Sequence, residues 1–145
     1  MIAVHYPEPV FKTRQETNGL AIFDELRKTW LKLTPEEWVR QNFVQYLLQD
    51  MRYPSGLIAL EKQIQLGELN KRFDILVYDR EYNPWMMVEC KSMNVRLDSK
   101  VLDQVLRYNM SLPVRFLIIT NGHACYGFDR SAGRLEELEQ LPSFT

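Results

Sequence analysis

The chain has 145 residues, 46% of them hydrophobic, and 18 Lys and Arg against 19 Asp and Glu give a formal net charge of -1. A domain of this size buries about two thirds of the surface that its unfolded chain exposes, so it needs neither disulfides nor a structural metal to fold. The composition excludes collagen-like, disordered and disulfide-scaffold classes. The charge balance excludes a protein that coats nucleic acid through overall positive charge, so a nucleic-acid partner would have to contact a local patch.

Two features concern the location of the protein. The two cysteines, Cys90 and Cys125, lie outside Cys-x-x-Cys and zinc-ligand spacings, which favours a reducing cytoplasm. The N-terminus has no basic segment followed by an apolar run, and no stretch approaches the ~20 apolar residues that span a bilayer. We therefore expect a cytoplasmic protein without a membrane partner.

The N-terminal part is predicted to differ from the rest. Residues 1–19 combine Pro, Asn and Gly with mixed charges, which indicates an extended arm with at most a short strand, and residues 20–145 are predicted to form a single domain. Residues 20–33 fit short strands or one helical turn. Trp38 points away from the apolar stripe of the next helix and is expected to contact the arm or another subunit.

A helix is predicted from about Pro35 to Asp50. Thr34 is a good N-cap, Pro35 suits the first helical position, and Glu37 stands three residues after the cap as in a capping box. The turn signal at residues 53–56 ends this helix.

Short apolar runs then predict a sheet. Residues 58–66, 72–78 and 85–91 have strand-like patterns and tight connections, which indicate an antiparallel meander. A helix from about residue 98 or 99 to 110 precedes a buried strand at 114–120.

Asn121 and Gly122 signal a type I′ turn into a strand at 124–128, and the acidic tail is expected to form a short helix. The order of helix, three strands, helix and strands predicts an α/β (α+β layered) domain with helices on both faces of a mixed sheet.

Charged residues interrupt two of these apolar strands. Asp74 interrupts the second strand, and Glu89 and Lys91 share one face of the third while Cys90 points to the other. Neighbouring strands would place Asp74 beside the pair. Asp74, Glu89 and the backbone carbonyl of Cys90 could hold Mg²⁺, and Lys91 could activate water or balance phosphate charge. An ordinary ion pair on a solvated strand is the alternative.

The first helix adds a further acidic candidate. Its apolar spacing places Glu36 in the middle of the buried stripe and Glu37 off it, so we assign Glu36 to the interior and Glu37 to the capping box. Arg40 lies near the same stripe and could pair with Glu36 or reach a phosphate. The alternative for Glu36 is a surface residue stabilised by the helix dipole.

The second helix is expected to bury one face and to carry two polar candidates. Val101, Val105, Tyr108 and Leu112 form the predicted buried face. Gln104 lies on its edge, one turn from Tyr108, so the polar ends of both side chains could reach the same cavity.

These residues resemble a known motif. Asp74, fourteen intervening residues and Glu89-Cys90-Lys91 are similar to the D…ExK core of the PD-(D/E)XK nuclease superfamily, whose minimal fold is helix, three strands, helix, strand. Within it, the chain resembles the N-terminal nuclease domain of type I restriction enzyme R subunits, in a small stand-alone bacterial form. The matching stretches, within residues 20–130, are LTPEEWVRQ, KRFDILVYD, VECKS, QVLRY and TNG.

The resemblance implies roles for individual residues. Asp74 and Glu89 would bind the metal, Lys91 would be the catalytic lysine, and Glu36 would be the acidic residue of the first helix. Gln104 with the tyrosine four residues later would match the Q-x-x-x-Y motif of this group. The chain departs from the pattern in having Phe rather than Pro before Asp74, and in lacking the motor and translocase domains of a restriction subunit.

Three functions follow from the sequence. The first is a DNA endonuclease that uses Mg²⁺, or Mn²⁺ in its place, to hydrolyse phosphodiester bonds, as a homodimer or in a larger DNA-processing complex. The second is a non-cleaving DNA-binding or assembly module that retains the nuclease fold. The third is an interaction domain in which the charged trio is only an ion-pair network.

Overall fold

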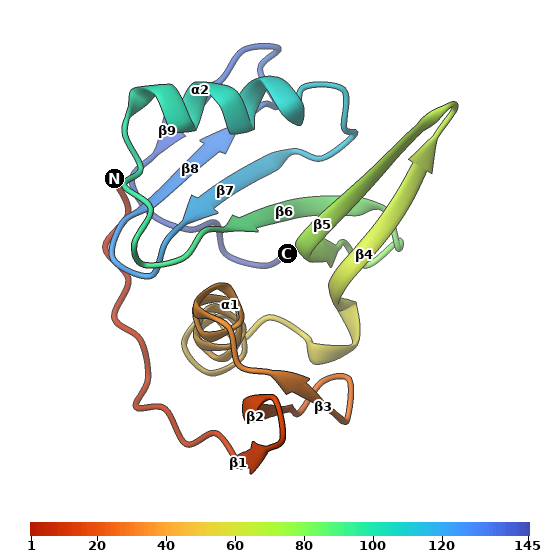
Figure 1. Cartoon of the computed structure of the whole chain (residues 1–145). Helices are drawn as coiled ribbons and strands as arrows, with labels where there is room; N and C mark the ends of the chain where they lie inside the picture. Colours follow the sequence, from red (N-terminus) through yellow and green to blue (C-terminus); the bar gives the residue numbers. More distant parts are fainter.

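The computed structural model describes residues 1–145, apart from the side chain of Leu66. It contains a three-stranded sheet, a six-stranded sheet and two α-helices (Figure 1). The elements in chain order are β1 Thr13–Glu16, β2 Gly19–Asp24, β3 Thr29–Lys32, α1 Pro35–Gln45, a π-helical turn Tyr46–Asp50, a 3-10 helix Ser55–Leu57, β4 Ile58–Leu66, β5 Leu69–Tyr78, β6 Pro84–Cys90, α2 Ser99–Tyr108, β7 Phe116–Thr120, β8 Cys125–Asp129 and β9 Glu136–Leu138. No helix in the described part of the chain is long and apolar enough to cross a membrane.

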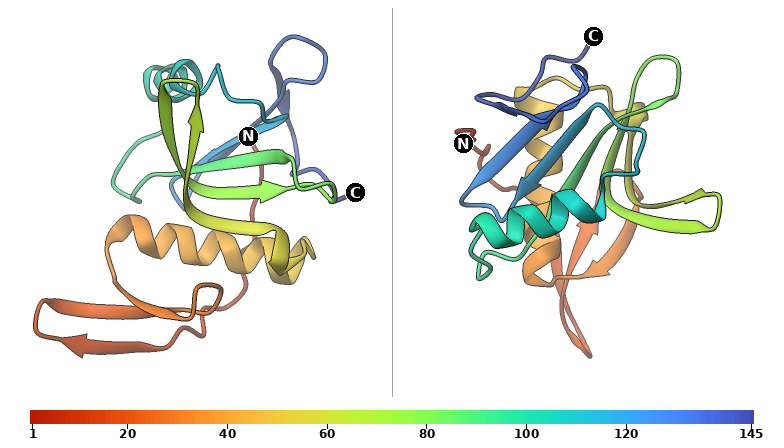
Figure 2. Two further views of the ribbon diagram at one scale, coloured as in Figure 1. Left: turned by 90° about the vertical axis from the view of Figure 1, so that its right-hand side faces the viewer. Right: turned by 90° about the horizontal axis from the view of Figure 1, so that it is seen from above.

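The six-stranded sheet is mixed. Its strands follow the order β4-β5-β6-β7-β8-β9, and neighbours are antiparallel except β6 and β7, which are parallel. A parallel pair needs a crossover connection, and α2 supplies it. α1 covers one face of the sheet and α2 the other (Figures 1 and 2). The predicted layered α/β fold and its antiparallel meander are confirmed.

The start of α1 follows its sequence signals. The Thr34 hydroxyl oxygen accepts a hydrogen bond from the backbone N–H of Glu37 at 3.0 Å, and Pro35 stands at the first helical position. The helix continues into the π-helical turn and ends before Arg52, whose φ of 59° reverses the chain. The predicted helix over 35–50 therefore corresponds to α1 and the π-helical turn together.

Three clusters of buried residues fix the helices to the sheet, and in one of them Val105 of α2 packs with Leu97 and Ile119. On the α1 side, Phe43 and Leu47 pack on Ile75, Val88 and Ile118 from three strands, and all five are fully buried. Burying a side chain of this kind stabilises the fold by about 1.5–3 kcal/mol, so this contact is the main attachment of α1. The opposite face carries a smaller cluster near α2: Phe73, Leu76, Met87, Leu112, Val114 and Leu117.

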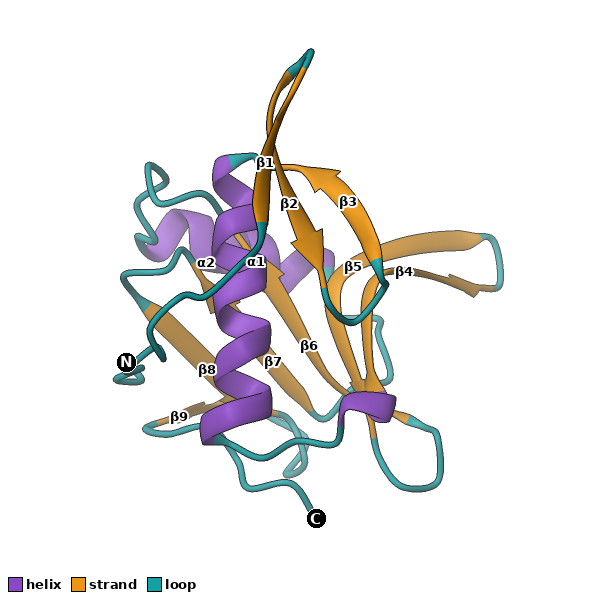
Figure 3. Ribbon diagram, turned by 90° about the horizontal axis from the view of Figure 1, so that it is seen from below, coloured by secondary structure: helices purple, strands orange, loops and turns teal.

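The small sheet lies on the side of α1 that faces away from the main sheet (Figure 3). Its strands pair in the antiparallel order β1-β2-β3, which confirms short strands in residues 20–33. Phe11 precedes β1 and packs on Trp38, with 5.6 Å between the ring centroids, as expected for a contact between Trp38 and the N-terminal arm. Ile2, at the start of this arm, is buried in the main core. The predicted division between residues 19 and 20 falls after the first residue of β2.

The predicted helix in the acidic tail is wrong. Glu136–Leu138 form β9, which pairs antiparallel with β8. An edge strand presents free backbone donors and acceptors, and pairing the tail with β8 satisfies them.

The predicted type I′ turn is also wrong, because four residues rather than two connect β7 to β8. Asn121 organises this loop: its side-chain oxygen accepts from the backbone N–H groups of His123 at 2.9 Å and Ala124 at 2.7 Å. Gly122 takes the positive φ of 90° that the loop requires. The side chain of Asn thus replaces part of the backbone turn.

Candidate functional site

Three charged residues converge as the sequence predicted: Asp74 on β5, Glu89 on β6, and Lys91 directly after β6. The side chain of Asp74 reaches the end of β6, where one of its oxygens accepts a hydrogen bond from the backbone N–H of Cys90 at 2.7 Å. Lys91 Nζ lies 3.5 Å from a carboxylate oxygen of Glu89. Because the side chains of Glu89 and Lys91 are 22% and 34% exposed, both are accessible from solvent.

Burial and the neighbouring carboxylate of Asp74 both disfavour the charged form of Glu89. Burial raises the pKa of Glu89, and the charge of Asp74 raises it further, while Lys91 opposes the shift. Cys90 is different in character: its thiol is buried in the core on the α1 side, and burial raises its pKa. The Cys90 thiol is therefore not a nucleophile, and only its backbone is a candidate for the site.

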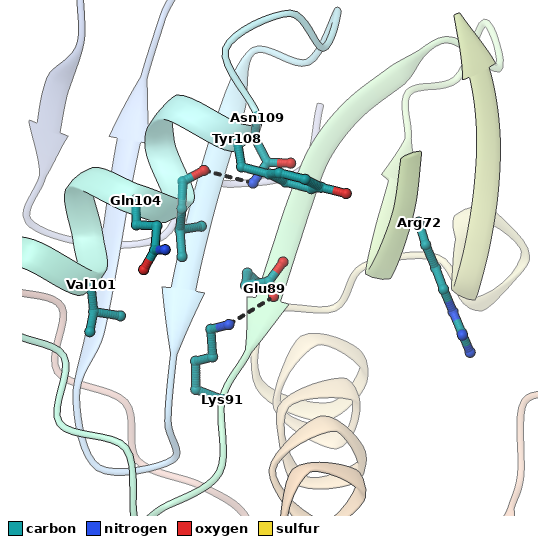
Figure 4. A pocket seen from close by; sticks show the side chains of 8 residues that line it. Arg72, Glu89, Lys91, Val101, Gln104, Tyr108 and Asn109 are labelled. Carbon is teal, nitrogen blue, oxygen red and sulfur yellow. Dashed lines mark hydrogen bonds and ion pairs between the residues drawn. The ribbon is translucent and has the colours of Figure 1, made fainter. Parts of the chain in front are cut away.

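Glu89 lies between two hollows. The first has a volume of about 360 Å³ and separates α2 from the ends of β5 and β6 (Figure 4). Its lining consists of Arg72, Glu89, Lys91, Val101, Gln104, Val105, Tyr108 and Asn109. The second has a volume of about 470 Å³ and opens toward α1 and β3. Its lining consists of Leu31, Lys32, Thr34, Glu36, Glu37, Arg40, Glu61, Arg72, Asp74 and Glu89.

The α2 candidates line the first hollow. Figure 4 shows Gln104 and Tyr108 on α2 across the hollow from Glu89 and Lys91. Tyr108 is 55% exposed, so its assignment to the buried face of α2 is wrong. Tyr108 is the last residue of α2, and its ring packs under the ammonium of Lys71, 3.4 Å from the ring centroid, instead of entering the core.

Arg40 is the centre of a buried ion-pair cluster. Its guanidinium contacts Glu37 at 2.5 Å, Glu61 at 2.5 Å and Asp74 at 3.1 Å. The Arg40 side chain is only 8% exposed. Arg40 therefore pairs with Glu37 rather than with Glu36, and its charge already neutralises part of the charge of Asp74.

The cluster extends to the small sheet. Gln41 donates to Glu37 at 2.9 Å and to Asp24 at 3.0 Å, and Arg27 lies 2.7 Å from Asp24. Burial raises the pKa of Asp24, but the hydrogen bonds from Arg27 and Gln41 outweigh it, so the pKa is lowered overall. Polar contacts thus connect β2, α1 and the candidate site without a break.

Glu61 links the cluster to the backbone of β4. Its φ of 50° lies in the left-handed region, which costs an L-residue about 1–2 kcal/mol. Its carboxylate contacts Arg40, and Arg72 at 2.7 Å. Burial raises the pKa of Glu61, but the charge of Arg40 and the hydrogen bond from Arg72 lower it overall. These ion pairs offset the cost of the strained backbone.

The placement of Glu36 in the interior is wrong. Glu36 is exposed, whereas Glu37 is only 5% exposed. The small sheet covers a second side of the N-terminal half of α1, so the buried face turns toward Glu37, Arg40 and Gln41. The Glu37 carboxylate consequently enters the ion-pair cluster instead of returning to the cap. Glu36 lies at the rim of the second hollow, and its catalytic role stays a prediction.

The donor set suits one metal ion that keeps much of its water. Within the described residues, no group of three or more His, Cys, Asp and Glu side chains could hold a metal. Asp74 and Glu89 are nevertheless hard oxygen donors, and each oxygen of Asp74 accepts one hydrogen bond, which leaves lone pairs free. Mg²⁺ binds through one or two carboxylates and retains several waters. The residues present therefore fit Mg²⁺.

Sequence reasoning missed Asp24, Arg27, Gln41 and Glu61. Glu61 is a charged residue within an apolar strand pattern, as Asp74 is, and this signal could have identified it. Asp24 and Arg27 lie in a segment without a clear period, and Gln41 lies outside the predicted apolar stripe of α1, so only the contact between the small sheet and α1 reveals these three residues.

The fold and the site define the class of protein. A helix, three antiparallel strands, a helical crossover and a parallel strand, with Asp74 and Glu89-Cys90-Lys91 on neighbouring strands, form the restriction-endonuclease-like core. The sequence profile of the family described as type I restriction enzyme R protein N terminus (HSDR_N) matches residues 35–142. Because this match covers most of the chain, the chain belongs to that family.

A solved structure shares the fold. It is a fragment described as an HsdR subunit of a type I restriction enzyme from Vibrio vulnificus YJ016, with a TM-score of 0.54 and 23% sequence identity. The match covers 77% of this chain and 24% of that one, so this chain spans about a quarter of its length. Comparison with curated proteins gives no match.

Proposed function

We propose that this chain is a Mg²⁺-dependent DNA nuclease module that hydrolyses phosphodiester bonds. The observation that carries the proposal is the convergence of Asp74, Glu89 and Lys91 between the two hollows: Lys91 lines the first, Asp74 lines the second, and Glu89 lines both. Membership of a family named for a restriction enzyme subunit supports DNA as the substrate and a larger complex as the setting.

The residues of the site have complementary tasks. The backbone N–H of Cys90 orients the side chain of Asp74. The carboxylates of Asp74 and Glu89, together with the Cys90 carbonyl, would hold the ion. Bound Mg²⁺ would supply positive charge that stabilises the leaving oxygen. Lys91 would donate to a phosphate oxygen or orient the attacking water, as its position beside Glu89 allows. Gln104 would position the substrate from α2.

A second function rests on one specific observation. Arg40 occupies one oxygen of Asp74 in an ion pair, so the site is partly neutralised without a metal. This arrangement favours a non-cleaving DNA-binding or assembly module that keeps the nuclease fold. A homodimer or a larger complex is compatible with both functions.

The test is cleavage of supercoiled plasmid and of single-stranded DNA with Mg²⁺ or Mn²⁺. We expect Lys91→Ala to lose cleavage by at least about 100-fold, the usual scale for a positioned acid–base group. Lys100→Ala, which removes an exposed lysine from α2, is the matched control and should cleave like the unaltered chain.

Calorimetry adds an independent readout. The unaltered chain should bind Mn²⁺, and Asp74→Asn should abolish this binding. Equal cleavage by Lys91→Ala and the unaltered chain would refute the nuclease proposal. Absence of cleavage together with measurable DNA binding would favour the non-cleaving module.

A further inference from the structure

One face of the small sheet combines aromatic rings with cations. Residues paired directly across β2 and β3 share a face, so Phe23 and Trp30 lie together, with 5.3 Å between their ring centroids. The Arg14 guanidinium lies 4.1 Å from the centroid of Trp30, and Lys12 Nζ lies 5.7 Å from that of Phe23. Lys32 is paired with Ala21 on the same face. We call these five residues, Lys12, Arg14, Phe23, Trp30 and Lys32, the aromatic–basic face.

This face is the side of the small sheet that points away from α1. The other face of the small sheet packs on α1 through Ile22, which is fully buried, and through Asp24, which bonds to Gln41 of α1. Strand side chains alternate between faces, so Phe23 and Trp30, which are paired across β2 and β3, point to the opposite side. The two rings are only partly buried, and the cations around them are exposed.

The charge of the face differs from that of the chain. Lys12, Arg14 and Lys32 give three positive charges, and Glu16, which pairs with Arg14 at 2.6 Å, gives one negative charge. The whole chain carries 18 basic and 19 acidic residues, so positive charge is concentrated on this face. This is the local patch that a polyanion requires in a nearly neutral protein.

The face is continuous with the candidate site. Lys32 belongs to the face and also lines the 470 Å³ hollow that contains Asp74 and Glu89. A strand whose phosphate lies at the carboxylates would therefore pass Lys32 and reach Trp30.

We propose that the aromatic–basic face binds an unpaired segment of DNA next to the cleavage site, with bases stacked on its aromatic rings and on the plane of the Arg14 guanidinium, and with phosphates held by its lysines and by the N–H groups of Arg14. Proteins that bind single strands combine cations with aromatic platforms, because each base offers a π-face. The inference rests on the proposed function, since it assigns that site a substrate with an unpaired segment.

The experiment measures binding of a fluorescein-labelled oligodeoxythymidine and of a duplex of equal length by anisotropy. Lys91→Ala serves as the background so that DNA is not cut during titration. Trp30→Ala should weaken single-strand binding roughly 5- to 150-fold, the range for loss of one stacked base, and should affect the duplex much less.

Charge variants test the phosphate contacts. Arg14→Gln with Lys32→Gln should reduce the slope of log affinity against log salt by about 1.4, since each phosphate contact on a single strand contributes about 0.7. Arg134→Gln is the matched control: Arg134 is exposed and pairs with Glu136 two residues away, as Arg14 pairs with Glu16, but it lies outside the face. It should leave affinity and slope unchanged.

Trp30→Phe keeps the fold testable if the alanine variant is unstable. Quenching of tryptophan emission by the oligonucleotide should be seen with Trp30 present and lost in Trp30→Phe, which retains Trp38 and Trp85. Three results would overturn the inference. They are equal single-strand affinity of the Trp30 and Arg134 variants, equal losses of affinity for single strand and duplex in the Trp30 variant, and no DNA binding at all. Cleavage that depends on Lys91 but not on the face would overturn the inference alone and leave the proposed function standing.

Discussion

Replacing Arg40 with Met tests the buried ion-pair cluster directly. The Met side chain is nearly as long as that of Arg but carries no charge, so Glu37, Glu61 and Asp74 would lose the cation that they share. Glu37 is 5% exposed and cannot recover this loss by hydration. Removing one partner of a buried ion pair typically destabilises a protein by about 3–5 kcal/mol.

The expected effect is large against the whole stability. Domains of this kind have an unfolding free energy of about 5–15 kcal/mol. With a urea m-value of about 2 kcal/mol/M, a loss of about 3–5 kcal/mol lowers the midpoint of urea unfolding by about 1.5–2.5 M. The midpoint of thermal unfolding should fall by about 6–20 °C.

Arg115→Gln is the control for this experiment. Arg115 makes two contacts of 3.1 Å with Asp129 and lowers the pKa of that carboxyl to about 2, but its side chain is 52% exposed. An exposed ion pair contributes about 0.2–1 kcal/mol. If Arg40→Met costs no more than Arg115→Gln, the cluster does not stabilise the fold and the reasoning is refuted.

Three further predictions concern other parts of the molecule. The pKa of Glu89 is raised in the folded state, so the unfolding free energy falls as pH rises from 4.5 through the raised pKa. Urea unfolding without divalent metal should therefore find Glu89→Gln more stable than the unaltered chain at neutral pH. Below pH 4.5 the two should be equally stable. Asn121→Ala removes the acceptor of two loop N–H groups and should lower the unfolding free energy by about 1–3 kcal/mol; an unchanged urea midpoint would contradict this role. Gly127→Ala would place a Cβ 2.9 Å from the terminal carbons of Ile2 and Ile118, so we expect a loss of about 1–3 kcal/mol by thermal unfolding, with an unchanged midpoint as the opposing result.

The sequence was sufficient where the site depends on local rules. Alternation along a strand put Glu89 and Lys91 on one face, and a short connection between neighbouring strands brought Asp74 beside them. The cap at Thr34 followed from side-chain chemistry that needs no tertiary contact.

The sequence was insufficient where burial depends on distant segments. Glu37 rather than Glu36 is buried because the small sheet packs against α1. The helical period of α1 carries no information about this contact. Arg40 meets Glu61 and Asp74 at separations of 21 and 34 residues, and no spacing rule connects such positions. The tail, by contrast, forms a strand through backbone pairing with the preceding strand β8, which its acidic sequence does not signal.

The connection between β5 and β6 has a consequence for folding kinetics. Only residues 79–83 separate these strands, so Asp74 and Glu89 approach each other as soon as this hairpin forms. Arg40 lies 34 residues from Asp74 in sequence, so the larger loop that brings it in closes later. We therefore expect the two carboxylates to meet during refolding before the guanidinium of Arg40 reaches Asp74, and a divalent cation or mild acidity should speed formation of this hairpin.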